Sequence, residues 1–346
     1  MKKRPTMYDI ADQLGISTGS VYRALNNKGR ISAQTRQRVL DAARDLGYVT
    51  NRAAQSLRKS PVSIGVVLCC PVSDYLRDIH RGVDAALDEL RQYNVFADVR
   101  DFGAVNSEDR FEEISQALGD FQSREVQGVA LFLSGDNTLF SEKIRELSDR
   151  GTRIATIAND IKGCARSLSV SADGTTAGRL AAQILALGCR GGRVAILTGK
   201  RKTGIHSSKV SGFLTEAEEK GWYTDIRTVE HDGTDASVTD QLKGIFSDPP
   251  PDGLYISAAL SRNALAFFER LDTRGTQIVM TDLRLEQRQF LSSGKVAASI
   301  FQNPYRQGKH SIERLYNQII SDTREEEICQ IIPQALFLSN LVLCEM

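Results

Sequence analysis

The chain has 346 residues, with 44 lysines and arginines against 43 aspartates and glutamates, and 41% of its residues are hydrophobic. The length predicts two or three domains, and the composition excludes a disordered chain, a collagen and a small disulfide-framed protein. No run of about 18 apolar residues exists, so no segment is expected to span a membrane. The six cysteines form no CxxC pair and the N-terminus lacks the apolar core of a secretory signal, so we expect a cytoplasmic protein.

The charge is distributed unevenly along the chain. Residues 1–60 carry twelve bases and four acids, a net charge of +8, whereas the remaining residues carry −7. Such an imbalance is typical of a polyanion-binding head on an acidic body, although a solvated surface has the same composition. The choice between a polyanion-binding head and a solvated surface therefore depends on the local structure of residues 1–60.

Three short helices are predicted in the head. We expect them after Thr6 up to Gly15, from Thr18 to about Asn26, and from about Ala33 to Leu46. Thr6 and Asp9 form a variant capping box for the first helix, and Ser17 caps the second. Two short helices joined by a tight glycine-containing turn, with a third packed against them, form a helix-turn-helix unit.

The second helix of such a unit lies in the major groove of DNA. Arg23 is the best candidate for a bidentate contact with a guanine edge, the alternative being a solvated surface charge. Tyr22 either packs on a thymine methyl or bonds to the backbone, and Tyr8 reaches a phosphate. The head residues expected to contact DNA are Tyr8, Ser17, Thr18, Gly19, Ser20, Tyr22, Arg23 and Asn26.

A long and specific pattern runs through this segment. It consists of Met7–Ala11, Gly15–Ser17, Val21–Asn26, Ser32–Arg36 and Leu46–Tyr48, followed by Asn51–Leu57. The pattern resembles the DNA-binding head of the lac repressor (LacI/GalR) family, and its last part resembles that family's hinge helix. The resemblance implies that Asn51, Ala54 and Leu57 also contact the operator, with Leu57 as an apolar wedge in the minor groove.

No catalytic set emerges from the sequence. Residues 15–19 match G-x-S-x-G, the nucleophile elbow of hydrolases, but that motif needs a strand before the serine and here an amphipathic helix precedes it. The chain also lacks H-E-x-x-H, a P-loop, and a G-x-G-x-x-G that follows a strand. We therefore expect no enzyme activity, no cofactor and no metal.

Beyond Pro61, short β-branched runs alternate with helical stretches. The runs are Ile64–Leu68, Val95–Val99, Gly128–Leu133, Ile154–Ile157, Val194–Leu197, Ile226–Val229, Leu254–Ile256, Ile278–Met280 and Val296–Phe301; the helical stretches include Ile79–Leu90, Thr175–Leu187, Val210–Lys220 and Ala264–Leu271. Strand and helix in alternation indicate a parallel sheet with helices on both faces. Nine or more strands predict two doubly wound α/β sheets, with ligands bound at the carboxyl ends of the strands.

The body also contains several short sequence motifs. They are Asp173-Gly174 with Ala177–Arg179, Lys209–Phe213, Thr281-Asp282, and Gln302–Pro304 with Gly308. These resemble the two-lobed effector domain of the same family, which is itself similar to periplasmic sugar-binding proteins. The resemblance implies that Asp173, Asp282 and Gln302 line a cleft, with Lys209 at a place usually held by arginine. It also implies that the chain crosses between the lobes near residues 188, 302 and 331.

A sugar or polyol effector suits these residue types. Vicinal hydroxyls donate and accept hydrogen bonds, so carboxylates, an amide and a cation fix them. An aromatic ring often stacks on the apolar face of a sugar, and Tyr75, Phe102 and Tyr255 are available for this. The expected effector contacts are Tyr75, Asp173, Lys209, Asp282 and Gln302. Structural roles stay open: Asp173 and Asp282 would cap helices beginning at Gly174 and near Glu286, and Gln302 would satisfy a loop carbonyl.

The expected organisation follows from these patterns. We expect a head at residues 1–49, a hinge and linker at 50–61, and an effector domain at 62–346, with one lobe at 62–188 and 303–331 and the other at 189–301 and 332–346. The function expected is that of a repressor binding double-stranded operator DNA under control of a small effector; the alternative is a solute-binding protein without a DNA role. A single head covers few base pairs, and the chain stops after a strand-like run, Ala335–Leu343, so we expect a homodimer.

Overall fold

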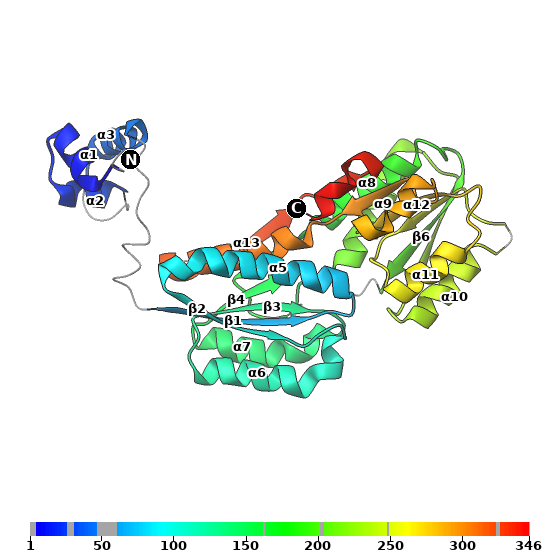
Figure 1. The fold of residues 1–346 in the computed structure, drawn as a ribbon, viewed down its shortest axis with the longest axis horizontal. Helices are drawn as coiled ribbons and strands as arrows, with labels where there is room; N and C mark the ends of the chain where they lie inside the picture. The colour runs from blue at the N-terminus through cyan, green and yellow to red at the C-terminus, as the bar shows by residue number, and fades with distance from the viewer. Residues whose placement is uncertain are drawn as a thin grey trace. The chain divides into compact units, whose positions relative to one another are not determined.

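The structure is a computed structural model that describes residues 5–25, 31–46, 61–161, 163–200, 204–247, 249–322 and 326–345. The chain separates into two compact units, Met1–Ser60 and Pro61–Met346 (Figure 1). Asn26 and the expected hinge contacts Asn51, Ala54 and Leu57 lie outside the described residues, so their predicted roles stay predictions.

The head consists of three helices around a small apolar core. They are α1 (Met7–Leu14), α2 (Thr18–Leu25) and α3 (Ala33–Asp45). Ile10, Val21 and Val39 are completely buried at the place where the three helices meet. The three predicted helices are therefore confirmed to within about one residue at the described ends.

Local capping explains where these helices begin and end. The hydroxyl of Thr6 accepts a hydrogen bond from the Asp9 amide, and the Asp9 carboxylate accepts one from the Thr6 amide, so the predicted capping box is present. The amide of Ser20 donates to the Ser17 hydroxyl over 3.2 Å, which confirms Ser17 as a cap. Gly15 ends α1 with φ = 64°, a left-handed conformation that a residue without a Cβ adopts readily.

The first lobe of the body is a six-stranded parallel sheet between two layers of helices (Figure 1). The strand order is β11 (Glu327–Ile331), β5 (Leu168–Ala172), β4 (Arg153–Ile157), β3 (Gly128–Leu133), β1 (Val62–Cys69) and β2 (Val95–Asp101). Helices α5 (Ser73–Leu90) and α13 (Pro304–Ser321) cover one face, and α6 (Phe111–Ser123) and α7 (Ser141–Asp149) cover the other. Both faces of β3 are buried, so its sequence is apolar throughout and does not alternate between apolar and polar residues.

The second lobe repeats this arrangement. Its strand order is β12 (Gln334–Leu336), β10 (Ala298–Phe301), β9 (Gln277–Thr281), β8 (Gly253–Ile256), β6 (Arg193–Gly199) and β7 (Asp225–His231). Helices α8 (Gly174–Leu185) and α9 (Gly204–Lys220) pack on one face, and α10 (Asp235–Ile245), α11 (Arg262–Arg270) and α12 (Arg288–Ser292) on the other. All pairs are parallel except β12, which runs antiparallel to β10. The predicted pair of doubly wound sheets is confirmed.

The structure places the first crossing between the lobes earlier than the expected residue 188. Strand β5 ends at Ala172 in the first sheet, and α8 begins at Gly174 and packs in the second lobe. The small buried residues of α8 fit against α9 and not against the first sheet, which decides the lobe to which this helix belongs. The crossings near 302 and 331 agree with the expectation, and the Asp173 amide donates to the Ile331 carbonyl, so two crossing segments lie side by side.

The last segment differs from the strand expected over Ala335–Leu343. Only Gln334–Leu336 forms strand β12, and a 3-10 helix, η5, follows from Leu338 to Glu345. The Asn340 amide side chain donates to the Ala335 carbonyl, while the Phe337 amide donates to Asn340 Oδ1. This local pairing turns the chain out of the sheet after three residues.

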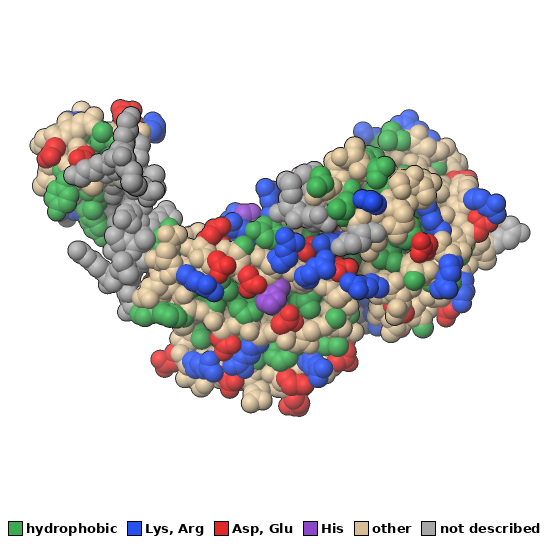
Figure 2. Space-filling view, viewed as in Figure 1, with side chains coloured by type: hydrophobic (Ala, Val, Ile, Leu, Met, Phe, Trp, Pro, Cys, Tyr) green, Lys and Arg blue, Asp and Glu red, His purple; other side chains and the backbone are tan. Residues whose placement is uncertain are grey.

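The surface of the body is mixed in charge. Figure 2 shows acidic and basic side chains interspersed over the visible face of the body, without one large patch of either sign. Among the helices of the described segments, none is long and apolar enough to cross a membrane. The net negative charge of the body is therefore dispersed on the face seen, which does not favour binding of a polyanion there.

Candidate functional site: a recognition helix and an interlobe pocket

Helix α2 carries most of the head residues that the sequence assigns to DNA, and three of them are exposed. Gly19, Tyr22 and Arg23 are exposed, whereas Val21 and Ala24 are buried against the other two helices. Thr18 and Ser20 are half-buried, and their contact with DNA stays a prediction. The face of α2 that points to solvent thus ends in a guanidinium and a phenol, groups that read base edges and phosphates.

Hydrogen bonds along α2 orient Arg23. Its Nη2 donates to the Ser20 hydroxyl over 3.2 Å, and the hydroxyls of Ser20 and Ser17 are 3.0 Å apart. Tyr8, on α1, is 70% exposed and is available for a phosphate contact beside this helix. The head therefore presents polar groups of two helices from one small, well-packed core.

A pocket that is partly open to solvent lies between the two lobes of the body. Its wall from the first lobe includes Val72, Asp74, Tyr75 and Pro304, and its wall from the second lobe includes Ala259, Leu260, Leu265, Met280–Arg284 and Gln287. The pocket combines apolar side chains with two carboxylates, a guanidinium and an amide. Such a mixture suits a small ligand with both polar and apolar faces.

Asp282 stands at the carboxyl end of β9 in a left-handed conformation, with φ = 56°. Its carboxylate accepts hydrogen bonds from the backbone amide of Gln302 over 2.8 Å and from Gln302 Nε2 over 2.5 Å. Burial raises the pKa of the Asp282 carboxyl above its ordinary value, and the hydrogen bonds from Gln302 and the nearby Lys209 charge oppose this shift. Aspartate is one of the few non-glycine residues that adopt this conformation readily, and here the chain changes direction directly after β9.

A chain of hydrogen bonds extends from Asp282 into the first lobe. Gln307 Nε2 donates both to the Gln302 carbonyl over 2.8 Å and to the Tyr75 hydroxyl over 3.0 Å. Gln307 is completely buried, and Tyr75 lines the pocket. The polar groups at the end of β9 are thus connected through α13 to the start of α5.

Lys209 lies behind this wall and is 2% exposed. Its Nζ donates to the Ser257 carbonyl over 2.9 Å. Burial lowers the pKa of Lys209 to about 8, and the Asp282 charge acts in the opposite direction. Lys209 therefore stabilises the end of β8 and the Asp282 charge at the same time.

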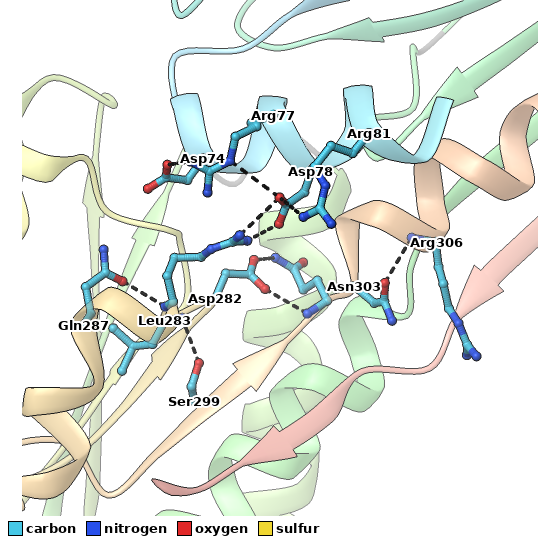
Figure 3. A network of polar contacts seen from close by, with 12 residues as sticks. Asp74, Arg77, Asp78, Arg81, Asp282, Leu283, Gln287, Ser299, Asn303 and Arg306 are labelled. Carbon is cyan, nitrogen blue, oxygen red and sulfur yellow. Dashed lines mark hydrogen bonds and ion pairs between the residues drawn. The ribbon is translucent and has the colours of Figure 1, made fainter. Parts of the chain in front are cut away.

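Two carboxylates of α5 face the second lobe (Figure 3). Asp78 binds the Arg284 guanidinium with both oxygens, one of the contacts being 3.1 Å between Oδ1 and Nη2. Asp74 lies 3.6 Å from Arg262 Nη2. Sequence reasoning missed these residues, although the spacing of Asp74 and Asp78 by four residues on a helix indicates one common face.

The family models divide the chain between the same two units. Residues 6–51 match the model of bacterial regulatory proteins of the lacI family, and residues 64–322, about three quarters of the chain, match the periplasmic binding protein domain. The chain belongs to the lacI family of bacterial regulators, with a periplasmic-binding-protein domain as its body. The solute-binding alternative without a DNA role is therefore not favoured.

Known relatives of this lacI-family regulator agree with that assignment. Catabolite control protein A of Priestia megaterium is 24% identical over 277 residues, which cover 79% of either chain. The lac repressor dimer bound to operator and the anti-inducer ONPF superposes with a TM-score of 0.59 at 18% identity, over 98% of this chain and 99% of that chain. GanP, a glucose-galactose binding protein from Geobacillus stearothermophilus, superposes with a TM-score of 0.68 at 21% identity, over 82% of this chain and 99% of that chain. The two structural matches show the fold.

The predicted effector residues of the lacI-family body occupy different places. Tyr75 and Asp282 line the pocket, Gln302 binds Asp282, and Lys209 lies behind the wall. Asp173 caps α8, since its two carboxylate oxygens accept hydrogen bonds from the amide and the hydroxyl of Thr176. The structural alternative considered for Asp173 is therefore present, whereas Asp282 does not cap the short helix near Glu286, which Arg284 precedes.

The lacI-family body should lose stability in acid through His206. Burial, with the nearby Lys209 and His231, lowers the pKa of His206 to about 3 from its ordinary 6.5. Between these values the unfolded chain binds the proton more strongly than the folded protein, so falling pH destabilises the fold, by at most about 1.4 kcal/mol per pH unit from this group. Urea unfolding between about pH 7 and about pH 4 measures the slope. His206→Gln should show a smaller slope, and equal slopes would contradict the assignment.

Proposed function

We propose that this protein is a repressor whose operator affinity is controlled by a small hydroxylated effector, such as a sugar or polyol, bound between the two lobes. The observation that carries the proposal is the pocket at Asp282, which lies in the same chain as an exposed recognition helix. Tyr75 and Asp282 contact the effector directly. Gln302 and Lys209 orient and stabilise Asp282, and Asp173 acts as a helix cap.

The chemistry of the wall supports a hydroxylated ligand. A carboxylate at Asp282 accepts hydrogen bonds from vicinal hydroxyls, while Arg284 and Gln287 supply donors. Leu260 and Leu283, with the ring of Tyr75, form an apolar surface for the carbon skeleton. No group in this arrangement combines a nucleophile with a base, so binding and not catalysis is the role proposed for the pocket.

DNA binding is proposed to involve two copies of the chain. A helix-turn-helix head reads only a few base pairs, so two heads on a pseudo-palindromic operator supply the affinity that one head lacks. A lac repressor dimer on its operator is a structural neighbour of this chain. The chromosomal target places the protein in the cytoplasm, associated with the nucleoid when bound.

A thermal-shift screen of sugars and polyols on the full chain tests the effector proposal. A ligand at about 100 times its Kd stabilises the folded state by about 2.7 kcal/mol, so the melting temperature should rise by about 5–10 °C. Asp282→Asn should abolish the rise, because the amide places a donor where hydroxyls need an acceptor.

Asp84→Asn is the matched control, since Asp84 is an exposed carboxylate on α5 that does not line the pocket. This variant should respond to the same ligand as the unchanged protein. A shift that persists undiminished in Asp282→Asn would remove Asp282 from the binding site, and a screen without any stabilising sugar or polyol would reject the ligand class.

A further inference from the structure

Two ion pairs join helix α5 of the first lobe to the second lobe. Asp74 and Asp78 are one helical turn apart on α5, and their partners are Arg262, the first residue of α11, and Arg284, which follows β9. The acids and the arginines of both pairs thus belong to different lobes. Figure 3 shows Asp74 and Asp78 on the side of α5 that faces the segment of Asp282 and Leu283.

The two pairs differ in burial. The side chains of Asp78 and Arg284 are 2% and 8% exposed, and the guanidinium contacts both carboxylate oxygens. The Arg262 side chain is 77% exposed and lies 3.6 Å from Asp74. Exposed pairs contribute little because water and salt screen them, whereas separating a buried pair leaves desolvated charges. The Asp78–Arg284 pair therefore dominates the interaction between the lobes at this place.

Arg284 belongs to the segment that lines the pocket. Its backbone amide donates to Gln287 Oε1 over 2.9 Å, and Asp282, two residues earlier, is bound by Gln302. A displacement at Asp282 therefore moves the anchor of the Arg284 side chain. The pocket wall and the interlobe ion pair are parts of one short segment.

Asp78 keeps other cationic neighbours when Arg284 is removed. Arg77 Nε and Arg81 Nη1 lie 3.9 and 3.6 Å from Asp78 Oδ1, and both belong to α5 itself. They stay with Asp78 whatever the second lobe does, so the carboxylate is not left without a cation in an open form. This arrangement lowers the cost of opening and makes the contact reversible.

We propose that the Asp78–Arg284 pair holds the two lobes closed without a ligand and transmits occupancy of the pocket to the angle between the lobes. The closure of the two lobes by this pair does not depend on the effector proposed above. The transmission of pocket occupancy to the angle between the lobes does rest on that proposed effector. Removal of Arg284 then shifts the ligand-free protein toward an open form, with both lobes folded.

Hydrogen exchange of the full chain without ligand tests closure. In Arg284→Met, exchange should be roughly tenfold faster in peptides covering residues 72–80 and 282–287, because these segments face each other only in the closed form. Strands β3 and β8, at the centres of the two sheets, should exchange as in the unchanged protein. Arg284→Lys keeps the charge but not the two-pronged contact and should give a smaller increase.

Arg77→Met is the matched control, since it removes a cation from the surroundings of Asp78 without removing a contact between the lobes. It should not make exchange at residues 282–287 faster, because the loss of a cation that stays with Asp78 in the open form cannot favour opening. Unaltered exchange in Arg284→Met would overturn the proposal, and so would faster exchange throughout both sheets, which would identify the pair as a contact that stabilises the whole fold. Neither outcome affects the ligand screen, because no ligand is present.

Discussion

Arg23→Ala should weaken operator binding by about 2–6 kcal/mol in the dimer, roughly thirtyfold or more, because two heads each lose a bidentate contact worth about 1–3 kcal/mol. Arg23 is exposed on α2 and oriented by the Ser20 hydroxyl. The loss of base preference should be confined to one base pair in each half-site. Selection of binding sites from random duplexes, followed by fluorescence anisotropy at one fixed salt concentration, measures affinity and base preference together.

Arg44→Ala provides the control for charge. Arg44 is an exposed arginine of the same head, on α3, with Asp41 as its neighbour 3.5 Å away. Its removal takes the same charge from the head, so any effect should be equal for all sequences and visible in the salt dependence. A base preference unchanged in Arg23→Ala would show that Arg23 contacts the DNA backbone only.

Gly178→Ala should destabilise the second lobe by about 3 kcal/mol. A Cβ at this position of α8 would lie 2.0 Å from the Lys209 carbonyl oxygen and 2.6 Å from the Phe213 amide nitrogen, both in the backbone of α9. Backbone cannot rotate away as a side chain does, so the two helices must separate, and overpacking of this kind costs about 1–3 kcal/mol or more. Urea unfolding measures the change, and effector binding should weaken with it because Lys209 lies at the contact.

Gly119→Ala is the corresponding control in α6. No atom lies within 4 Å of a Cβ built there, so the substitution should raise the free energy of unfolding by about 0.5–1 kcal/mol through helix propensity and the entropy of the unfolded chain. The two substitutions are chemically identical and differ only in what surrounds them. An equally mild effect at both positions would contradict the close packing of α8 and α9.

The head was predictable helix by helix because its signals are local. Thr6, Ser17 and Ser32 each cap a helix within three residues of themselves, and the apolar spacing identifies the buried face. The same locality identified Arg23 as exposed. Each of the nine expected strands of the body also overlaps an observed one, since buried strands of parallel sheets are dense in β-branched and apolar residues.

Two strands, β5 and β11, were missed for a physical reason. β5 has the sequence LSVSA, and β11 alternates exposed and half-buried residues. Their polar positions are accommodated by partners far along the chain, such as β11 beside β5. The family resemblance placed the end of the first lobe after α8, near residue 188, whereas packing against α9 shows that α8 belongs to the second lobe.

The pocket, too, was predictable only in part from the sequence. The family resemblance implied that Asp282 lines a cleft, and the chemistry of a sugar ligand led us to expect an aromatic ring such as Tyr75 beside it. Hydrogen-bond partners are not encoded locally: Asp173 binds Thr176 within its own helix, while Asp78 meets Arg284 from 206 residues away. Helices, strands and chemical class thus follow from short-range patterns in the sequence. The choice of lobe, and of which charged groups meet across the pocket, depends on packing between segments that are distant in sequence.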